Sequence, residues 1–227
     1  EAAIDSYKQS LKIKPGYAMA HSNMGNALKD KGDLAAAIDS YQQAIKFKFD
    51  YAEAYNNMGT VLTGIVFKKQ KFGLMEVITS LLDQRTSCRP KDIARAAISL
   101  LKFEPILKEL LEKHSLGTLR QSLQETASTL AELPLLLKLM SVCPIADLEL
   151  ESILVNLRSA LLSSADEIAI HPVILRFQSA LALQCFTNEY IYTQTDKETE
   201  LLEVIENLIE KALSAGQQPS PKAILCL

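Results

Sequence analysis

Residues 18–51 read AMAHSNMGNALKDKGDLAAAIDSYQQAIKFKFDY, and features of this 34-residue stretch recur on both sides of it. Tyr7 returns as Tyr41 and Gly25 returns as Gly59, so both offsets are 34 (41 − 7 and 59 − 25). A period of this length is typical of helix–turn–helix units that bury their apolar faces only by stacking on their neighbours. The sequence therefore predicts a stacked array of helix pairs in this region.

The residues of this unit resemble those of the tetratricopeptide repeat (TPR) family. Met24 and Gly25 stand where the family has a Leu-Gly pair. Ala37 and Ala44 occupy its two small positions, and Tyr41 occupies its aromatic position. The small residues suit a close crossing of the two helices, and the tyrosine fills the space beyond. The resemblance implies an all-α fold with TPR helix–turn–helix repeats forming an α-solenoid.

Only one repeat is complete. Residues 1–17 resemble the second helix of a preceding unit, and residues 52–63 resemble the first helix of a following unit. The pattern fails from Gly64 onward, and Phe49 stands where the preceding unit has its closing Pro15. We expect three segments: a partial TPR array over residues 1–64, a linker over 65–73, and an irregular all-helical domain over 74–227 that is truncated at its C-terminal end.

Apolar residues at spacings of three and four predict further helices after the array. The predicted ranges are 74–82, 93–101, 106–111, 119–130, 148–162, 174–186 and 201–213. Prolines mark helix starts, where a fixed φ and a missing N–H do least harm; they are Pro90, Pro105, Pro134, Pro144, Pro172 and Pro219. Thr195 and Glu198 predict a capping box, and Gly216 predicts the end of that helix.

The composition predicts a soluble, core-forming protein of the cytoplasm. The chain is 48% hydrophobic and 22% charged, with no Trp and only eight Gly, which disfavours a many-turned β-sandwich or a glycine-looped nucleotide fold. No uninterrupted apolar stretch is long enough to cross a membrane. Four cysteines lie far apart without a CxxC pair, so neither a disulfide framework nor a zinc site is expected.

No residue can be nominated for catalysis, for metal binding or for holding a cofactor. The three histidines are isolated from one another, Ser163, Ser164 and Ser220 lack a GxSxG turn, and phosphate-binding glycine loops are absent. Carboxylates such as Glu203, Glu206 and Glu210 alternate with apolar residues, so we expect them on the solvent side of a helix.

Charge is unevenly distributed along the chain. Residues 1–64 are neutral, residues 65–114 carry 10 basic and 6 acidic side chains (+4), and residues 115–227 carry 7 basic and 14 acidic ones (−7). Lys68, Lys69 and Lys71 stand together and could meet phosphate. A nucleic-acid reader would show a larger basic excess or a recognisable motif, so a solvated face is preferred and no nucleic-acid partner is expected.

Asparagines give the best interaction signal. Asn23 and Asn57 are 34 residues apart, and Asn26 follows Asn23 by one turn, all on first helices of the repeats. Such a ladder resembles the groove lining with which TPR arrays grip extended peptides, because a side-chain amide can donate and accept one hydrogen bond each. The alternative is that these are ordinary solvated residues. The partner predicted by the ladder is a protein or peptide.

Residues 176–192, with Cys143, Pro144 and the closing residues 218–221, resemble a known helical region. It lies between TPRs and a C-terminal class I S-adenosylmethionine-dependent methyltransferase domain in bacterial fusion proteins. The alternative is a core aromatic cluster, since Phe186 and Tyr190 share a helix face. If the resemblance holds, catalysis lies beyond residue 227.

Two functions from different classes follow. The first is a protein-interaction scaffold that binds an extended peptide in the TPR groove. The second is the substrate-recruiting or regulatory part of a methyltransferase. The incomplete first repeat also predicts self-association through the open end of the array.

Overall fold

The computed structural model describes residues 1–84, 88–115, 123–163, 172–187 and 195–219. These residues form twelve helices and no strand, so the all-α fold class expected from the sequence is confirmed. Contacts within the chain divide it into two compact units, Glu1–Leu101 and Lys102–Leu227. Each unit has its own core.

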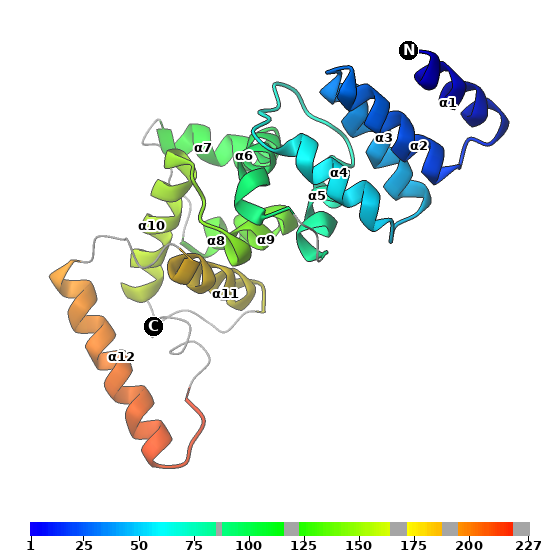
Figure 1. The fold of residues 1–227 in the computed structure, drawn as a ribbon. Coiled ribbons are helices and arrows are strands. Elements are labelled where there is room, and N and C mark those ends of the chain that lie inside the picture. The colour runs from blue at the N-terminus through cyan, green and yellow to red at the C-terminus, as the bar shows by residue number, and fades with distance from the viewer. Residues whose placement is uncertain (85–87, 116–122, 164–171, 188–194, 220–227) are drawn as a thin grey trace. The chain divides into compact units, whose positions relative to one another are not determined.

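The first unit begins with four helices that lie side by side, drawn in blue to cyan in Figure 1. They are α1 (Ala2–Ile13), α2 (Ala18–Asp30), α3 (Leu34–Phe47) and α4 (Ala52–Leu62). The pairs α1–α2, α2–α3 and α3–α4 all pack together, and α2 also contacts α4. This is the stacking of neighbouring helix pairs that the 34-residue period predicts.

The complete repeat is held by a close approach between α2 and α3. A Cβ atom placed on Gly25 would lie 2.6 Å from the Cε1 atom of the Tyr41 ring, so only glycine admits the ring at this distance. Ala37, Tyr41 and Ala44 on α3 are all fully buried. The small and aromatic positions named from the sequence therefore form the interior of the unit.

The turns that close successive units have the same geometry. The N–H of Tyr17 donates to the carbonyl of Lys14, and the N–H of Tyr51 donates to the carbonyl of Lys48, both at 3.2 Å. In each turn the lysine ammonium lies over the tyrosine ring, at 5.3 Å and 4.9 Å from its centroid. The second turn forms although Phe49 stands at the proline position.

The segment after α4 departs from the repeat. Gly64 has a φ of +76° in the left-handed region, and residues 64–73 form no helix. Helices α5 (Leu74–Asp83) and α6 (Pro90–Leu101) then complete the first unit. A Cβ atom placed on Gly59 would lie 2.8 Å from the Cβ of Cys88 and 3.7 Å from Leu81, so these residues cover the glycine of the last repeat.

The observed units differ from the predicted segments in one respect. The first unit extends to Leu101 and includes α5 and α6, which contact α3 and α4, respectively. The sequence places the change from repeats to the helical domain at residues 65–73. That division stays a prediction, because compactness alone does not show which segments fold independently.

The second unit holds the remaining helices. They are α7 (Pro105–Ser115), α8 (Leu123–Ala131), α9 (Pro134–Val142), α10 (Leu148–Ser163), α11 (Pro172–Thr187) and α12 (Asp196–Ser214). Four of the six prolines singled out, Pro90, Pro105, Pro134 and Pro172, are first residues of helices. Each predicted range overlaps an observed helix, although residues 119–122 lie outside the described part of the chain.

Helix α9 is absent from the helices predicted by periodicity. Its sequence is an almost continuous apolar run, and Leu135, Leu136, Leu139 and Met140 are all buried, so no polar face marks its period. Its C-terminal carbonyls are bound by Gln184 of α11. In the orientation that satisfies both amide atoms, Gln184 donates to the carbonyls of Cys143 (3.1 Å) and Met140 (3.2 Å), and accepts from the N–H of Ile145 (2.9 Å).

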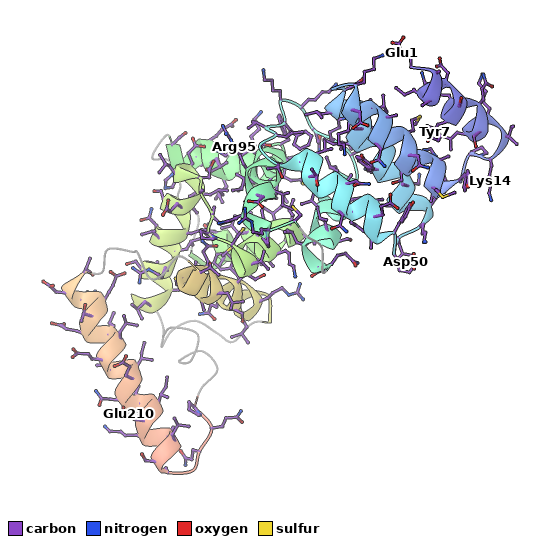
Figure 2. The ribbon with its side chains drawn as sticks, viewed as in Figure 1. Glu1, Tyr7, Lys14, Asp50, Arg95 and Glu210 are labelled. Carbon is purple, nitrogen blue, oxygen red and sulfur yellow. The ribbon has the colours of Figure 1, made fainter. Side chains whose placement is uncertain are left out.

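Helix α12 has the predicted capping box at its start. The Thr195 hydroxyl accepts from the N–H of Glu198, and the Glu198 carboxylate accepts from the N–H of Thr195. The helix ends at Ser214, and Gly216 follows with a φ of +68°. Glu203, Glu206 and Glu210 are exposed as expected, and Figure 2 shows Glu210 projecting from the helix.

A nearly buried ion pair joins α12 to α10. Glu198 is 3% exposed, and its Oε1 atom lies 3.0 Å from Nη2 of Arg158. Burial by itself raises the pKa of Glu198. The hydrogen bonds from Thr195 and Ser159 and the charge of Arg158 outweigh it, so the pKa of Glu198 lies below its ordinary value.

We expect Gly25→Ala to lower the free energy of unfolding by about 1 to 3 kcal/mol, because the added methyl group overpacks against the Tyr41 ring. Urea unfolding followed by circular dichroism measures this change. In a Tyr41→Ala background the overlapping ring atoms are gone, and the same substitution should stabilise by up to about 1 kcal/mol through helix propensity. Stabilisation in both backgrounds would contradict the close approach.

The Glu198 ion pair predicts an acid-sensitive second unit. Because the folded-state pKa is lowered, the stabilisation is present above the ordinary value of 4.5 and is lost as the pH falls below it. Urea unfolding should therefore show Glu198→Gln less stable than wild type at neutral pH, with the difference shrinking in acid. Glu203→Gln, an exposed change on the same helix, is the control. A pH-independent difference for Glu198→Gln would contradict the linkage.

Candidate functional site

Asn23 and Asn57 lie at equivalent places on contacting helices. Asn23 is on α2 and Asn57 is on α4, and both side chains are half-buried. Because α2 and α4 contact each other, residues at the same repeat position share one side of the stacked units. The two asparagines can therefore be neighbours along a common face, and they keep some exposed surface for a ligand.

Asn26 has a different environment. Its Oδ1 atom accepts a hydrogen bond of 2.7 Å from the hydroxyl of Tyr41, the tyrosine that fills the interior of the repeat. In the next repeat this position is Thr60, whose hydroxyl donates to the carbonyl of Asn56 at 3.0 Å. Asn26 thus helps to hold the repeat together, and its amide oxygen is already bound.

Two carboxylates lie on the same face as the asparagines. Asp30 follows Asn26 by four residues on α2, and Glu53 precedes Asn57 by four residues on α4, so each pair is adjacent on its helix surface. Both carboxylates are exposed. Burial raises the pKa of Tyr41 to about 12, and the negative charges of Asp30 and Glu53 add to this rise. The asparagine face is therefore locally negative.

Side-chain contacts hold the turns at both ends of the complete unit. The Tyr51 hydroxyl donates to Oε2 of Glu53 at 3.4 Å, and burial together with that carboxylate raises the pKa of Tyr51. His21 donates from Nε2 to the carbonyl of Pro15 at 2.8 Å and stacks on Phe47 with ring centroids 5.5 Å apart. These contacts fix the first turn against α2 and α3, so the face is preformed.

The cysteines of the described segments are poor nucleophiles. Burial raises the pKa of the Cys143 thiol to about 11, and burial is also the main cause that raises the pKa values of Cys88 and Cys185. A nucleophilic cysteine needs the opposite shift, toward the thiolate. Cys143 is buried in the core, and Cys88 and Cys185 are half-buried, so all three behave as small apolar side chains.

An open pocket of the second unit lies between α7 and the C-terminal end of α8. It is lined by Ile106, Glu109, Leu110, Thr129 and Glu132. Glu109 forms an ion pair with Lys113, which lowers the pKa of its carboxyl group. The lining offers carboxylates and a hydroxyl but no histidine or thiol to activate a nucleophile. Among the residues with described positions, no three His, Cys, Asp or Glu side chains are grouped to hold a metal ion.

Some residues of the asparagine face are not predicted from the sequence. Asp30 and Glu53 were not singled out, although their four-residue spacing from Asn26 and Asn57 was readable. The Tyr41–Asn26 hydrogen bond could not be read, because it joins residues 15 apart on different helices. Ser164, residues 188–192 and residues 220–221, which belong to motifs considered above, lie outside the described residues.

The TPR repeat family matches residues 1–32 and 25–63. This match and the stacked helix pairs support tetratricopeptide repeats over residues 1–63, and such repeats generally mediate protein–protein interactions. No curated protein is similar enough to the chain to count as a relative. None of the helices in the described ranges is both long and apolar enough to cross a membrane.

We expect Tyr41→Phe to cost about 0.5 to 1.5 kcal/mol in the free energy of unfolding, because it removes the hydrogen bond to Asn26. Wild-type stability should also fall as the pH rises from the ordinary tyrosine value of 10.0 toward 12, where the buried phenol ionises. The Tyr41→Phe variant should lack this fall in stability at high pH, because phenylalanine does not ionise. Asn26→Ala removes the same bond from the acceptor side, so additive costs in the double variant would contradict the pairing.

Proposed function

We propose that the chain is a protein-interaction scaffold that binds an extended peptide of a partner protein along the face of α2 and α4. The observation that carries the proposal is the placement of Asn23 and Asn57. They occupy the same position in successive repeats, on contacting helices, and both remain partly exposed. A peptide lying across the two helices would meet one amide from each.

The chemistry of this face suits a peptide backbone. Each asparagine amide can donate to a peptide carbonyl and accept from a peptide N–H, which recognises extended chain without regard to sequence. Asp30 and Glu53 add selectivity, because a basic side chain on the peptide would gain from their charge. Asn26 keeps its amide donor for a peptide, since its oxygen accepts from Tyr41. The proposed ligand is therefore an extended peptide with lysine or arginine.

Self-association of the chain stays a prediction. Ile13 at the end of α1 is 87% exposed and would favour such a contact.

We also propose that the protein is located in the cytoplasm. The thiols of Cys143 and Cys185, which form no disulfide, support this proposal, because disulfides are rare there.

A second candidate function is the substrate-recruiting or regulatory part of an S-adenosylmethionine-dependent methyltransferase with its catalytic domain beyond residue 227. The resemblance of residues 176–192 favours it, and 176–187 of this segment lie in α11. Calorimetry would then show no S-adenosylmethionine binding by residues 1–227 and binding by a longer parent chain. If the longer chain did not bind S-adenosylmethionine, the methyltransferase function would be rejected and only the scaffold function would remain.

The groove is tested with a basic extended peptide selected from a displayed library and titrated by calorimetry. Asn23→Ala with Asn57→Ala should weaken binding by about 1 to 3 kcal/mol, since each lost hydrogen bond contributes about 0.5 to 1.5 kcal/mol. The helical content should not change. Gln9→Ala with Gln43→Ala is the matched control, because these exposed amides are also 34 residues apart (43 − 9) but lie on second helices.

A further pair, Asp30→Asn and Glu53→Gln, should weaken the same peptide and reduce the salt dependence of its affinity. Equal affinity of wild type and the asparagine double variant would reject the ladder. An equal loss in the glutamine control would also reject it, because the effect would then not depend on the face.

A further inference from the structure

The loop formed by residues 64–73 takes the place where the third repeat would begin its second helix. Several hydrogen bonds hold this loop on the first unit. The N–H of Phe67 donates to Oγ of Ser99 on α6 at 2.9 Å, and Nε2 of Gln42 on α3 donates to the carbonyl of Phe72 at 2.8 Å. Nζ of Lys71 contacts both carboxylate oxygens of Asp39, at 2.6 and 2.8 Å. The loop is therefore fastened near both ends.

Between and beside these anchors the loop presents apolar and basic side chains to solvent. Phe72 is 85% exposed although its backbone carbonyl is held by Gln42, and Val66 is 47% exposed. Lys68 and Lys69 are exposed, and neither has an ion pair among the described side chains. An exposed aromatic ring on an anchored backbone offers apolar surface to a partner at a fixed place.

Helix α6 adds positive charge next to the loop. Arg95 lies one turn before Ser99, the residue that binds the loop, and Lys91 lies one turn before Arg95, so the three residues share a face. Figure 2 labels Arg95, which belongs to the same helix as Ser99. Arg95 is exposed and has no acidic partner within the described residues, whereas nearby Lys71 is neutralised by Asp39. We call Phe72, Val66, Lys68, Lys69 and Arg95 the basic–aromatic patch.

We propose that the basic–aromatic patch is a second docking surface, which binds an acidic peptide segment carrying an apolar side chain. The carboxylates of the segment pair with Lys68, Lys69 and Arg95, and its apolar side chain packs on the ring of Phe72. The anchored backbone lowers the entropy cost of binding, because the loop does not have to be ordered by the partner.

Charge favours a peptide over an extended polyanion. Residues 115–227 carry a net charge of −7 (7 − 14), and the whole chain carries −3. A membrane surface or a nucleic acid spreads negative charge over a wide area and would repel much of the chain. A short acidic segment meets only the local positive field of the patch.

The patch is independent of the asparagine face. It lies on residues 64–73 and α6, whereas the asparagines lie on α2 and α4, and the local charge is positive at one surface and negative at the other. The two surfaces therefore select peptides of opposite charge. Loss of one binding activity should leave the other unchanged.

The test uses the 227-residue chain and a fluorescein-labelled peptide of about 15 residues that repeats Glu-Glu-Leu, with binding followed by anisotropy at low and high salt. We expect binding that weakens with salt. Lys68→Gln with Lys69→Gln should weaken it about tenfold, and Phe72→Ala should weaken it by a similar factor. A peptide with Gln in place of Glu should not bind.

Matched controls exist for both changes. Lys12→Gln with Lys46→Gln removes the same charge from exposed lysines of the repeats, and Phe49→Ala removes a phenylalanine that is 80% exposed in another turn. Unchanged affinity in these controls and in Asn23→Ala with Asn57→Ala would support the patch. Equal losses in the controls would overturn it. Binding of anionic vesicles or of single-stranded DNA without binding of the peptide would also overturn it, since the occupant would then be a membrane or a nucleic acid.

Discussion

The contact between Gly25 and the Tyr41 ring is the constraint on which the repeat depends. Without a side chain on Gly25, the ring can enter the crossing of α2 and α3, and its hydroxyl then reaches Asn26. The same contact brings the two helices close enough for the small residues Ala37 and Ala44 to be fully buried. The stacking of the neighbouring helices on this pair, and hence the face that carries Asn23 and Asn57, follows from it.

The next glycine of the series shows what happens when the aromatic partner is absent. Gly59 occupies the position equivalent to Gly25, but no second helix with a tyrosine follows α4. Cys88 and Leu81 approach Gly59 instead. The side chains that cover this glycine therefore come from outside the repeat, near the start of α6 and from α5. Residues 64–73 do not cover this glycine and form an anchored loop instead.

Much of the fold could be predicted from the sequence, because its causes are local. The 34-residue period, the prolines at helix starts and the Thr195 capping box each act within a few residues. Helix α9 could not be predicted by period, since its apolar run is buried almost all round and has no polar face. The contacts of Cys88 with Gly59 and of Gln42 with Phe72 join residues about 30 apart, and only the folded chain brings them together. For the site, the asparagine positions were readable, whereas the internal bond that occupies Asn26 was not.

Glu198 has two tasks in the second unit. Its carboxylate accepts from the N–H and hydroxyl of Thr195, which starts α12, and it also meets Arg158 of α10, which fastens the helix to the unit. Nucleation of the helix and its attachment are consequently one event. If α12 detached with its first turn intact, the contact of Glu198 with Arg158 would break. If α12 stayed attached with a frayed first turn, the hydrogen bonds of Glu198 with Thr195 would break. The second unit therefore gains cooperativity from a single side chain, and substitution of that residue removes both functions together.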